Sequence, residues 1–349
     1  MIEIDGSYGE GGGQILRTAI SLAALTLTPI RISEIRARRP KPGLKRQHMA
    51  GIELTAKLVD AAVEGLEIGS TEVKFVPRAR KSGVFHFDVE TAGSISLILQ
   101  AVLPAAVMAP GPIEFHLNGG TDVKWSPPID YFREVFINMV HHLGPEIRLE
   151  QKRRGHYPRG GGEVICHVRP VQNLNAISMI EFGEVSSIRG ISHCVKLPSH
   201  VAERQAGAAQ ELIKDRLGVP VDFDVEYYTK NEDRHLGPGS GIVIWADGTE
   251  GSRLGADSLG DKGISAEVVG RRAAEQLVRE INSGMAIDSH LCDMIVPYLA
   301  MATGVSRIGI TEITSHLKTN LWTINQILGT SFDLEGETGQ SGVLSIRGK

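Results

Sequence analysis

Residues 308–328, IGITEITSHLKTNLWTINQIL, pass from alternating apolar residues to a helical spacing within a few positions. The alternation predicts a strand over Ile308–Ile313, and the spacing that follows predicts a helix over Leu317–Leu328. The junction between them, residues 314–320, is mostly polar. The same sequence of strand, polar junction and helix occurs twice earlier in the chain, and this repetition decides the predicted fold.

Each of three copies has a strand, a helix, a second strand, a second helix and two closing strands. The first copy has strands over Met1–Asp5, Ile30–Ile35, Leu66–Gly69 and Glu72–Val76, and helices over Gln14–Leu25 and Leu44–Val63. The second has strands over Val84–Val89, Ile113–Leu117, Ile147–Gln151 and Glu163–Val168, and helices over Ser94–Met108 and Pro128–Leu143. The third adds a strand over Ala176–Phe182, a helix over Ser289–Ala302, and closing strands over Ser331–Leu334 and Val343–Ile346.

A different set of elements interrupts the third copy. It has strands over Gly190–Leu197, Val221–Tyr228 and Gly241–Ala246, and helices over His200–Leu217 and Ile264–Ile281. The sequence therefore predicts an α/β (α+β) protein with three tandem β-α-β-α-β-β repeats. A large three-repeat domain would comprise residues 1–183 and 283–349, with a smaller α+β domain, residues 184–282, inserted in the third repeat.

The composition narrows the class of protein. The chain has 349 residues, 42% of them hydrophobic, and a net charge of −4, so bulk charge alone gives no reason to expect a nucleic-acid partner. Its three cysteines have no C-x-x-C spacing, which argues against a disulfide framework or a thiolate zinc site. Residues 1–5 are no signal peptide, and the longest apolar run, Leu97–Ala109, is too short to cross a bilayer. We expect a soluble cytoplasmic protein.

Two segments of the first copy suggest phosphate binding. In residues 9–14, GEGGGQ, glycines before a helix would let backbone N–H groups approach a phosphate. Glu10 would repel that phosphate unless a divalent cation bridged the two; the alternative is a tight turn in which Glu10 favours the helix N-terminus. Residues 36–47 concentrate cations on a proline-broken loop, which favours a phosphate or nucleic-acid ligand over a solvated basic loop.

His316 lies in the polar junction quoted above, where a strand ends and a helix begins. The positive end of the helix would disfavour imidazolium and attract a phosphate to the same place. A neutral imidazole that attacks an α-phosphate forms a covalent phosphoramidate. Asp122 and Asp293 could be caps, ion-pair partners or site residues, and Trp125 and Tyr131 could stack on a base or belong to the core.

Taken together, the ordered motifs resemble the RNA 3'-terminal phosphate cyclase family. The resemblance rests on residues 5–17, 35–48, 119–122 with 127–128, 157–162, 290–293 and 315–320. It covers almost the whole chain and implies the same fold of three repeats with an inserted domain. It implies an ATP-dependent enzyme whose partner is RNA with a 3'-phosphate end, with Mg²⁺ or Mn²⁺ as the divalent cation.

The implied reaction has three steps. His316 would attack ATP, release pyrophosphate and form a histidine–AMP adduct. The AMP would pass to the RNA 3'-phosphate, and the neighbouring 2'-hydroxyl would displace it to leave a 2',3'-cyclic phosphodiester. The catalytic residues implied are Glu10, Arg17, Arg36, Arg39, Gln47 and His316, with Glu10 as the metal ligand. The RNA phosphate would contact Arg36, Arg39 and Arg46.

The nucleotide would contact seven further residues: Gln100, Pro128, His290, Leu291, Cys292, Asp293 and Met294. Two of them depart from the family pattern, since many relatives carry tyrosine at the position of His290 and glutamine at that of Met294. An imidazole should stack on adenine less well than a phenol ring, which puts the affinity or choice of nucleotide in question.

Two alternatives remain at this point. A non-catalytic branch of the same scaffold works in ribosome assembly, but it lacks the nucleophilic histidine that this chain has. Enolpyruvyl transferases share the repeat architecture and need no covalent nucleotide. The physiological RNA, the preferred metal, the role of the inserted domain and a homo-oligomeric state are left open.

Overall fold

A computed structural model describes residues 1–9 and 11–349, so Glu10 lies outside the described residues. The segment at 308–328 forms strand β16 (Val305–Ile310) and helix α9 (Ser315–Leu328). The helix begins two residues earlier than predicted because the hydroxyl of Thr314 accepts a hydrogen bond from the backbone N–H of Leu317 and caps it. His316 is therefore the second residue of α9.

Three four-stranded sheets share one topology, which confirms the predicted repeat. Their strand orders are β1-β2-β4-β3, β5-β6-β8-β7 and β10-β16-β18-β17. In each sheet the first two strands in this order are parallel and the other neighbours are antiparallel. The strands not yet given are β1 (Ile2–Asp5), β2 (Ile30–Ser33), β3 (Ala62–Glu64), β4 (Val73–Val76), β5 (Gly83–Asp88), β6 (Ile113–Gly119), β7 (Glu146–Arg153), β8 (Gly162–Arg169), β10 (Ser178–Met179), β17 (Phe332–Glu335) and β18 (Gly342–Arg347).

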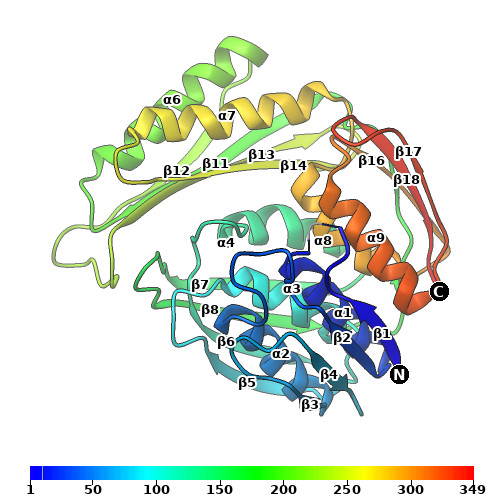
Figure 1. Cartoon of the computed structure of the whole chain (residues 1–349). Coiled ribbons are helices and arrows are strands. Elements are labelled where there is room, and N and C mark those ends of the chain that lie inside the picture. Colours follow the sequence, from blue (N-terminus) through cyan, green and yellow to red (C-terminus); the bar gives the residue numbers. More distant parts are fainter. Residues whose placement is uncertain (10) are drawn as a thin grey trace.

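The helices of the repeats lie between these sheets and share one hydrophobic core (Figure 1). Helix α1 packs on α2, α3 and α9, so the first and third repeats meet through α1 and α9. Besides α9, the helices of the repeats are α1 (Gly13–Thr26), α2 (Arg46–Val59), α3 (Ile95–Ala106), α4 (Ile129–Tyr131), the π-helical turn η1 (Phe132–Phe136), α5 (Ile137–His142) and α8 (Ser289–Leu299). None of the helices in the described part of the chain is long and apolar enough to span a membrane.

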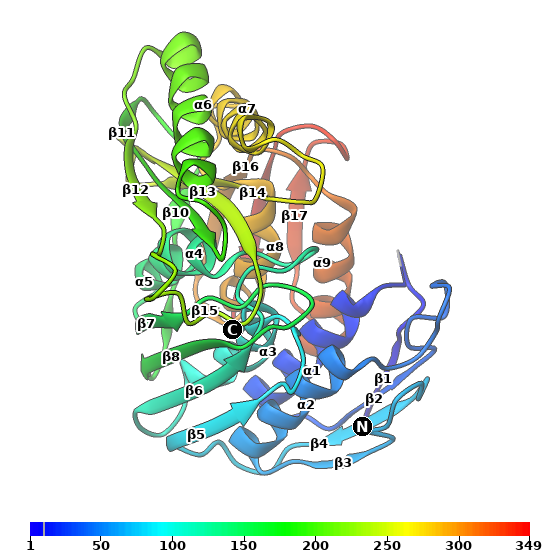
Figure 2. The same cartoon turned by 90° about the vertical axis from the view of Figure 1, so that its left-hand side faces the viewer.

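The segment inserted in the third repeat forms its own sheet, with strand order β12-β11-β13-β14, and two helices cover one face of it (Figures 1 and 2). The elements are β11 (Val185–Val195), α6 (His200–Leu217), β12 (Asp222–Glu226), β13 (Gly239–Gly248), β14 (Arg253–Leu259) and α7 (Ala266–Asn282). Alternate residues of β13 face opposite ways, as a strand requires. Ile242 and Ile244 pack in the core under α6 and α7, whereas Val243 and Trp245 join the core of the repeats. We propose that residues 184–282 form a separate domain, inserted into the larger domain of residues 1–183 and 283–349.

Some predicted elements were wrong in detail. Helix α2 ends at Val59, where Asp60 takes a left-handed conformation, and not at Val63. The predicted strand over 66–69 is a turn, and the third strand of that repeat is β3 instead. Strand β14 was not predicted, and a two-stranded ladder joins β9 (Leu174–Asn175) to β15 (Ala302–Thr303). The helix predicted over 128–143 is interrupted by the π-helical turn η1.

Candidate active site

The predicted nucleophile, His316, lies at the exposed start of α9. The first backbone N–H groups of a helix have no partner inside the helix, and the helix dipole adds positive potential there. One of these N–H groups, that of Leu317, is taken up by Thr314. A phosphate placed beside His316 would meet the positive end of α9, as the sequence predicted.

Gln14, at the start of α1, holds the imidazole of His316. Its Nε2 donates to the backbone oxygen of His316 at 3.1 Å, and its Oε1 lies within hydrogen-bond distance of His316 Nδ1. Because a carbonyl oxygen can only accept, the Nε2 contact fixes the orientation of the amide, and Nδ1 must donate to Oε1. In the neutral imidazole the lone pair then lies on Nε2, the other ring nitrogen.

A polar network joins α1, α8 and α9 beneath His316. Asp293 Oδ1 accepts from the Thr314 hydroxyl at 3.2 Å, and the Asp293 backbone oxygen accepts from Asn320 Nδ2 at 2.8 Å. Thr18 on α1 donates to Asn320 Oδ1 at 2.7 Å. Burial raises the pKa of Asp293 to about 7, although His290, Thr314 and Arg17 act in the opposite direction. The network therefore fixes the start of α9 relative to the nucleotide residues predicted on α8.

The glycine segment before α1 lies directly against the basic loop of residues 36–47. A Cβ on Gly12 would lie 3.1 Å from Arg39 Nη2, and one on Gly13 would lie 2.4 Å from His48 Nε2. Arg38 Nη1 donates to the backbone oxygen of Gly9 at 3.0 Å. These close approaches explain why glycines occupy the segment, and they bring cationic side chains to the first turn of α1. Glu10, predicted to hold the metal, lies outside the described residues.

Several residues predicted to bind the RNA phosphate are engaged within the protein. Arg36 is 7% exposed, and its Nη1 donates to the backbone oxygens of Lys41 and Gly43 at 2.7 and 2.8 Å. Arg46 pairs with Glu53 at 2.7 Å and with Glu90 at 3.5 Å.

Gln47 is engaged as well, since both ends of its amide bond the backbone of Ser94. Arg36 thus shapes the basic loop and Gln47 ties α2 to α3. Of the arginines predicted to bind the RNA phosphate, Arg39 is the one that lies against the glycine segment, next to Arg38.

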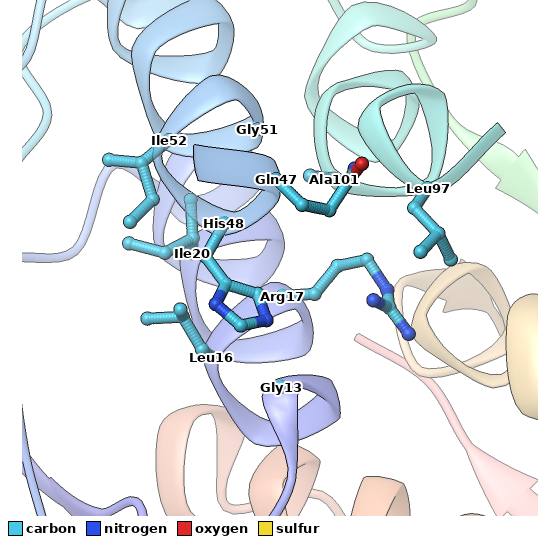
Figure 3. A pocket seen from close by; sticks show the side chains of 10 residues that line it. All are labelled: Gly13, Leu16, Arg17, Ile20, Gln47, His48, Gly51, Ile52, Leu97 and Ala101. Carbon is cyan, nitrogen blue, oxygen red and sulfur yellow. The ribbon is translucent and has the colours of Figure 1, made fainter. Parts of the chain in front are cut away.

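A pocket opens between α1, α2 and α3, and Figure 3 shows the Arg17 side chain extending across it between His48 and Leu97. Burial lowers the pKa of Arg17 to about 10, and Asp293 acts against this shift. Burial, followed by Arg36, Arg17 and Lys45, lowers the pKa of His48 to about 3. The pocket therefore presents one guanidinium and one neutral imidazole. Its lining residues are Gly13, Leu16, Arg17, Ile20, Gln47, His48, Gly51, Ile52, Leu97 and Ala101.

The structure brings some of the predicted nucleotide residues together. Gln100 Nε2 lies 3.0 Å from Met294 Sδ, which joins α3 to α8. His290 is exposed and lies edge-on to Tyr131, with ring centroids 6.5 Å apart. The side chains of Leu291 and Cys292 are buried, so only their backbone could contact a ligand.

Pro128 is a buried N-cap residue of α4. The aromatic residues on either side of it have different roles. Tyr131 is fully buried and its hydroxyl donates to Asp288 at 2.6 Å, whereas Trp125 is 95% exposed. Tyr131 therefore belongs to the core, and Trp125 is the exposed ring of the two.

Sequence reasoning placed Gln14 and His48 inside motifs but gave neither a role in the site. Gln14 is separated from His316 by 302 positions, so nothing local in the sequence indicated their contact. The available signal was positional: Gln14 and His316 both lie at the start of a helix in copies of the same repeat.

Fold and site together define an α/β protein of three repeats in which a histidine, a glycine segment and cationic side chains meet at helix N-termini. The family model for RNA 3'-terminal phosphate cyclase matches residues 8–334. A protein of that name from Methanopyrus kandleri is 53% identical over 347 residues, 99% of this chain and 99% of the relative. Another from Ignicoccus hospitalis is 52% identical over 349 residues, covering 100% and 99%. The chain belongs to the RNA 3'-terminal phosphate cyclase family.

This membership confirms the predicted family and favours a cyclase over the non-catalytic relative. A solved structure, the enolpyruvyl transferase NikO from Streptomyces tendae, aligns with 99% of this chain and 48% of that chain. Its TM-score is 0.43 and its sequence identity 10%. A similarity of this size is too weak to assign a fold or a function.

Proposed function

We propose that this chain uses ATP to convert an RNA 3'-terminal phosphate to a 2',3'-cyclic phosphodiester through a covalent His316–AMP intermediate, releasing pyrophosphate and then AMP. The contact that carries this proposal is the pairing of Gln14 with His316. It places a proton on Nδ1, so that in the neutral ring the lone pair is on Nε2 and the nucleophile is oriented before ATP binds. Because the imidazole ring is already held in one orientation, it loses less conformational entropy when it reaches the transition state.

The surroundings of His316 suit the first step. Attack of Nε2 on the α-phosphate forms a P–N bond and breaks the bond to pyrophosphate, so negative charge grows on the leaving group. The N-termini of α1 and α9 and the guanidinium of Arg39 supply positive potential for that charge. Gln100 on α3 and Asp293 and Met294 on α8 would contact the adenosine.

The same groups suit the acceptor phosphate of the later steps. Arg17 extends across the pocket beside α1, and Arg39 lies over Gly12, so a terminal phosphate could contact both. Arg36, Gln47 and Arg46 would act mainly by holding the basic loop and α2 in place, because each bonds to other groups of the protein. The 2'-hydroxyl then attacks the activated phosphorus and AMP leaves.

A divalent cation would bind at Glu10. A carboxylate among glycines suits Mg²⁺ or Mn²⁺, which prefer oxygen ligands and take few from the protein. When bound, the cation would neutralise charge on the triphosphate. We also propose a cytoplasmic location. Cysteines stay as free thiols in a reducing compartment, and the three cysteines of this chain are free and buried.

The proposal is tested with an RNA oligonucleotide that carries a radioactive 3'-phosphate. With ATP and Mg²⁺, the label should become resistant to phosphatase and become sensitive again after acid opens the cyclic ester. An ATP analogue with a non-cleavable bond between the α- and β-phosphates should give no conversion. Conversion with that analogue, or none with ATP while the folded protein binds the RNA, would overturn the proposal.

A further inference from the structure

A second group of polar side chains lies away from His316, where the second repeat meets the inserted segment. Asp122 follows β6, His156 lies between β7 and β8, and His193 is on β11. All three are buried, with 2%, 7% and 1% exposure. One ligand atom from each lies within 4.8 Å of the others. We propose that Asp122, His156 and His193 bind a divalent metal ion such as Zn²⁺, and that this ion links the inserted segment to the repeats.

The distances suit tetrahedral coordination. Zinc binds imidazole nitrogen at about 2.0–2.1 Å, so two such ligands of a tetrahedral ion lie about 3.4 Å apart. His156 Nε2 and His193 Nε2 are 3.3 Å apart. Asp122 Oδ1 is 3.9 Å from His193 Nε2, and one ligand atom of each of the three residues lies within 4.8 Å of the others, so shifts of up to about 1.4 Å would bring three ligands around one ion. The two imidazoles and the carboxylate are ligand types that zinc takes, and a fourth position stays open.

The hydrogen bonding of the cluster is incomplete among the described residues. Asp122 Oδ1 and His193 Nδ1 are buried and have no hydrogen-bond partner. Whichever ring donates across the 3.3 Å contact, Asp122 Oδ1 stays unpaired, and a buried unpaired carboxylate oxygen is costly. A cation bound to Oδ1 and both Nε2 atoms removes that cost, although His193 Nδ1 remains without a partner.

The other oxygen of Asp122 is anchored as metal-binding carboxylates commonly are. Oδ2 accepts from Thr121 Oγ1 at 2.6 Å and from Arg154 Nη1 at 3.4 Å, which leaves Oδ1 directed at the histidines. Arg154 also pairs with Asp130 at 2.7 Å and with Glu226 at 2.6 Å. Even with Arg133 paired to Asp130, three carboxylates face two guanidiniums, so the cluster attracts a cation.

Two glycines of β13 let the rings approach so closely. A Cβ on Gly239 would lie 2.1 Å from Cγ of His156, and one on Gly241 would lie 2.9 Å from Cε1 of His193. His156 thus packs directly on the inserted sheet, while its backbone is held in the second repeat by a bridge to Asp122. A metal at this point would fix the inserted sheet over the second repeat.

A third imidazole, that of His235, lies near the cluster. Its Nε2 is buried and has no hydrogen-bond partner among the described residues. Its Nδ1 lies 2.9 Å from Asp233 Oδ1, the carboxylate–imidazole pairing that orients metal-binding histidines. His235 is not one of the three residues whose ligand atoms lie within 4.8 Å of one another, so we leave the open position to a water molecule.

The test uses the full chain, freed of metal with a chelator, loaded with Zn²⁺ and desalted. Elemental analysis should find one zinc ion per chain. In His156→Asn and His193→Asn, this zinc should fall to less than a tenth, while His200→Asn, a matched change at an exposed histidine of the inserted segment, should retain it. Glu10→Ala should also retain the zinc, which separates this metal from the proposed catalytic cation.

Loading with Co²⁺ provides a second readout that depends on no variant. The intense visible bands of tetrahedral cobalt should appear with wild-type protein and titrate to one equivalent. The thermal midpoint of the zinc-loaded chain should exceed that of the metal-free chain, and His193→Asn should lose this difference. The proposal is overturned if wild-type protein retains no zinc and gives only octahedral cobalt bands, or if folded His156→Asn and His193→Asn retain zinc as His200→Asn does.

Discussion

At the scale of single residues, the arrangement of the site depends on pairings across the repeats. Gln14 and His316 both lie at helix starts, yet the sequence indicated only the histidine, because a histidine at a helix start has a recognisable chemistry. The role of Gln14 comes from a contact between repeats that no local pattern encodes. The same holds for Arg36, whose sequence context suggested phosphate binding and whose guanidinium donates to the backbone of its own loop.

Replacing Gln14 tests the orientation of the nucleophile. In Gln14→Ala the imidazole loses its acceptor at Nδ1, so the initial rate of AMP attachment should fall by about ten- to a hundredfold. The thermal midpoint should change little, because His316 is exposed. Gln14→Glu, which can still accept from Nδ1, should retain more of the rate than Gln14→Ala. Equal rates for wild type and Gln14→Ala would contradict the assigned role.

A second residue-scale prediction concerns Glu280 of α7. Burial, then Asp288, raises its pKa to about 7, while Thr311, His290 and Ser289 act in the opposite direction. A carboxyl group whose pKa is raised on folding stabilises the protein at low pH, and this contribution is lost as the pH rises through about 7. Glu280→Gln cannot ionise, so it should be more stable than wild type at pH 8, by on the order of 2 kcal/mol, and gain little at pH 5.

The measurement is the free energy of unfolding in urea at both pH values, followed by circular dichroism. If Glu280→Gln keeps the same loss of stability between pH 5 and pH 8 as wild type, another group is responsible.

At the scale of elements, the glycine segment and the basic loop form one unit around the start of α1. Sequence patterns predicted both as phosphate-binding segments, and their contact is consistent with that prediction. The elements predicted least well were short ones, such as β3 and the turn at residues 66–69, where glycines at 65 and 69 take positive φ. Such turns depend on a few backbone angles, to which apolar spacing is insensitive.

Arg39→Ala tests whether the basic loop acts on RNA. Because Arg39 lies against Gly12 of the glycine segment, we expect RNA cyclisation to slow by about tenfold or more, with a smaller loss in AMP attachment. Arg46→Ala is the matched control, since it removes an arginine that follows the same loop, starts α2 and pairs with Glu53 and Glu90. The two rates would be compared in single-turnover assays with ATP alone and with the preformed adduct plus RNA. Equal losses in both steps would contradict a role in RNA phosphate binding.

At the scale of the whole molecule, repetition made the fold predictable. Three copies of one order of elements gave three sheets of one topology, and the shared core lies between them. The inserted segment was foreseen, but its packing was not, because alternation along β13 does not say which face meets the repeats. The cluster of Asp122, His156 and His193 escaped sequence analysis for a similar reason: it has no short ligand spacing and forms only when the inserted sheet covers the second repeat.

The central claim is the covalent histidine–AMP intermediate, and labelling with α-³²P-ATP tests it most directly. Wild-type protein with Mg²⁺ should acquire label that is lost in acid and retained in base, as expected for a phosphoramidate, and peptide mapping should place it on His316. His316→Asn should fold with an unchanged circular dichroism spectrum, because the side chain is exposed, and should acquire no label. Label that persists in folded His316→Asn, or that maps to another residue of the wild type, would contradict the account.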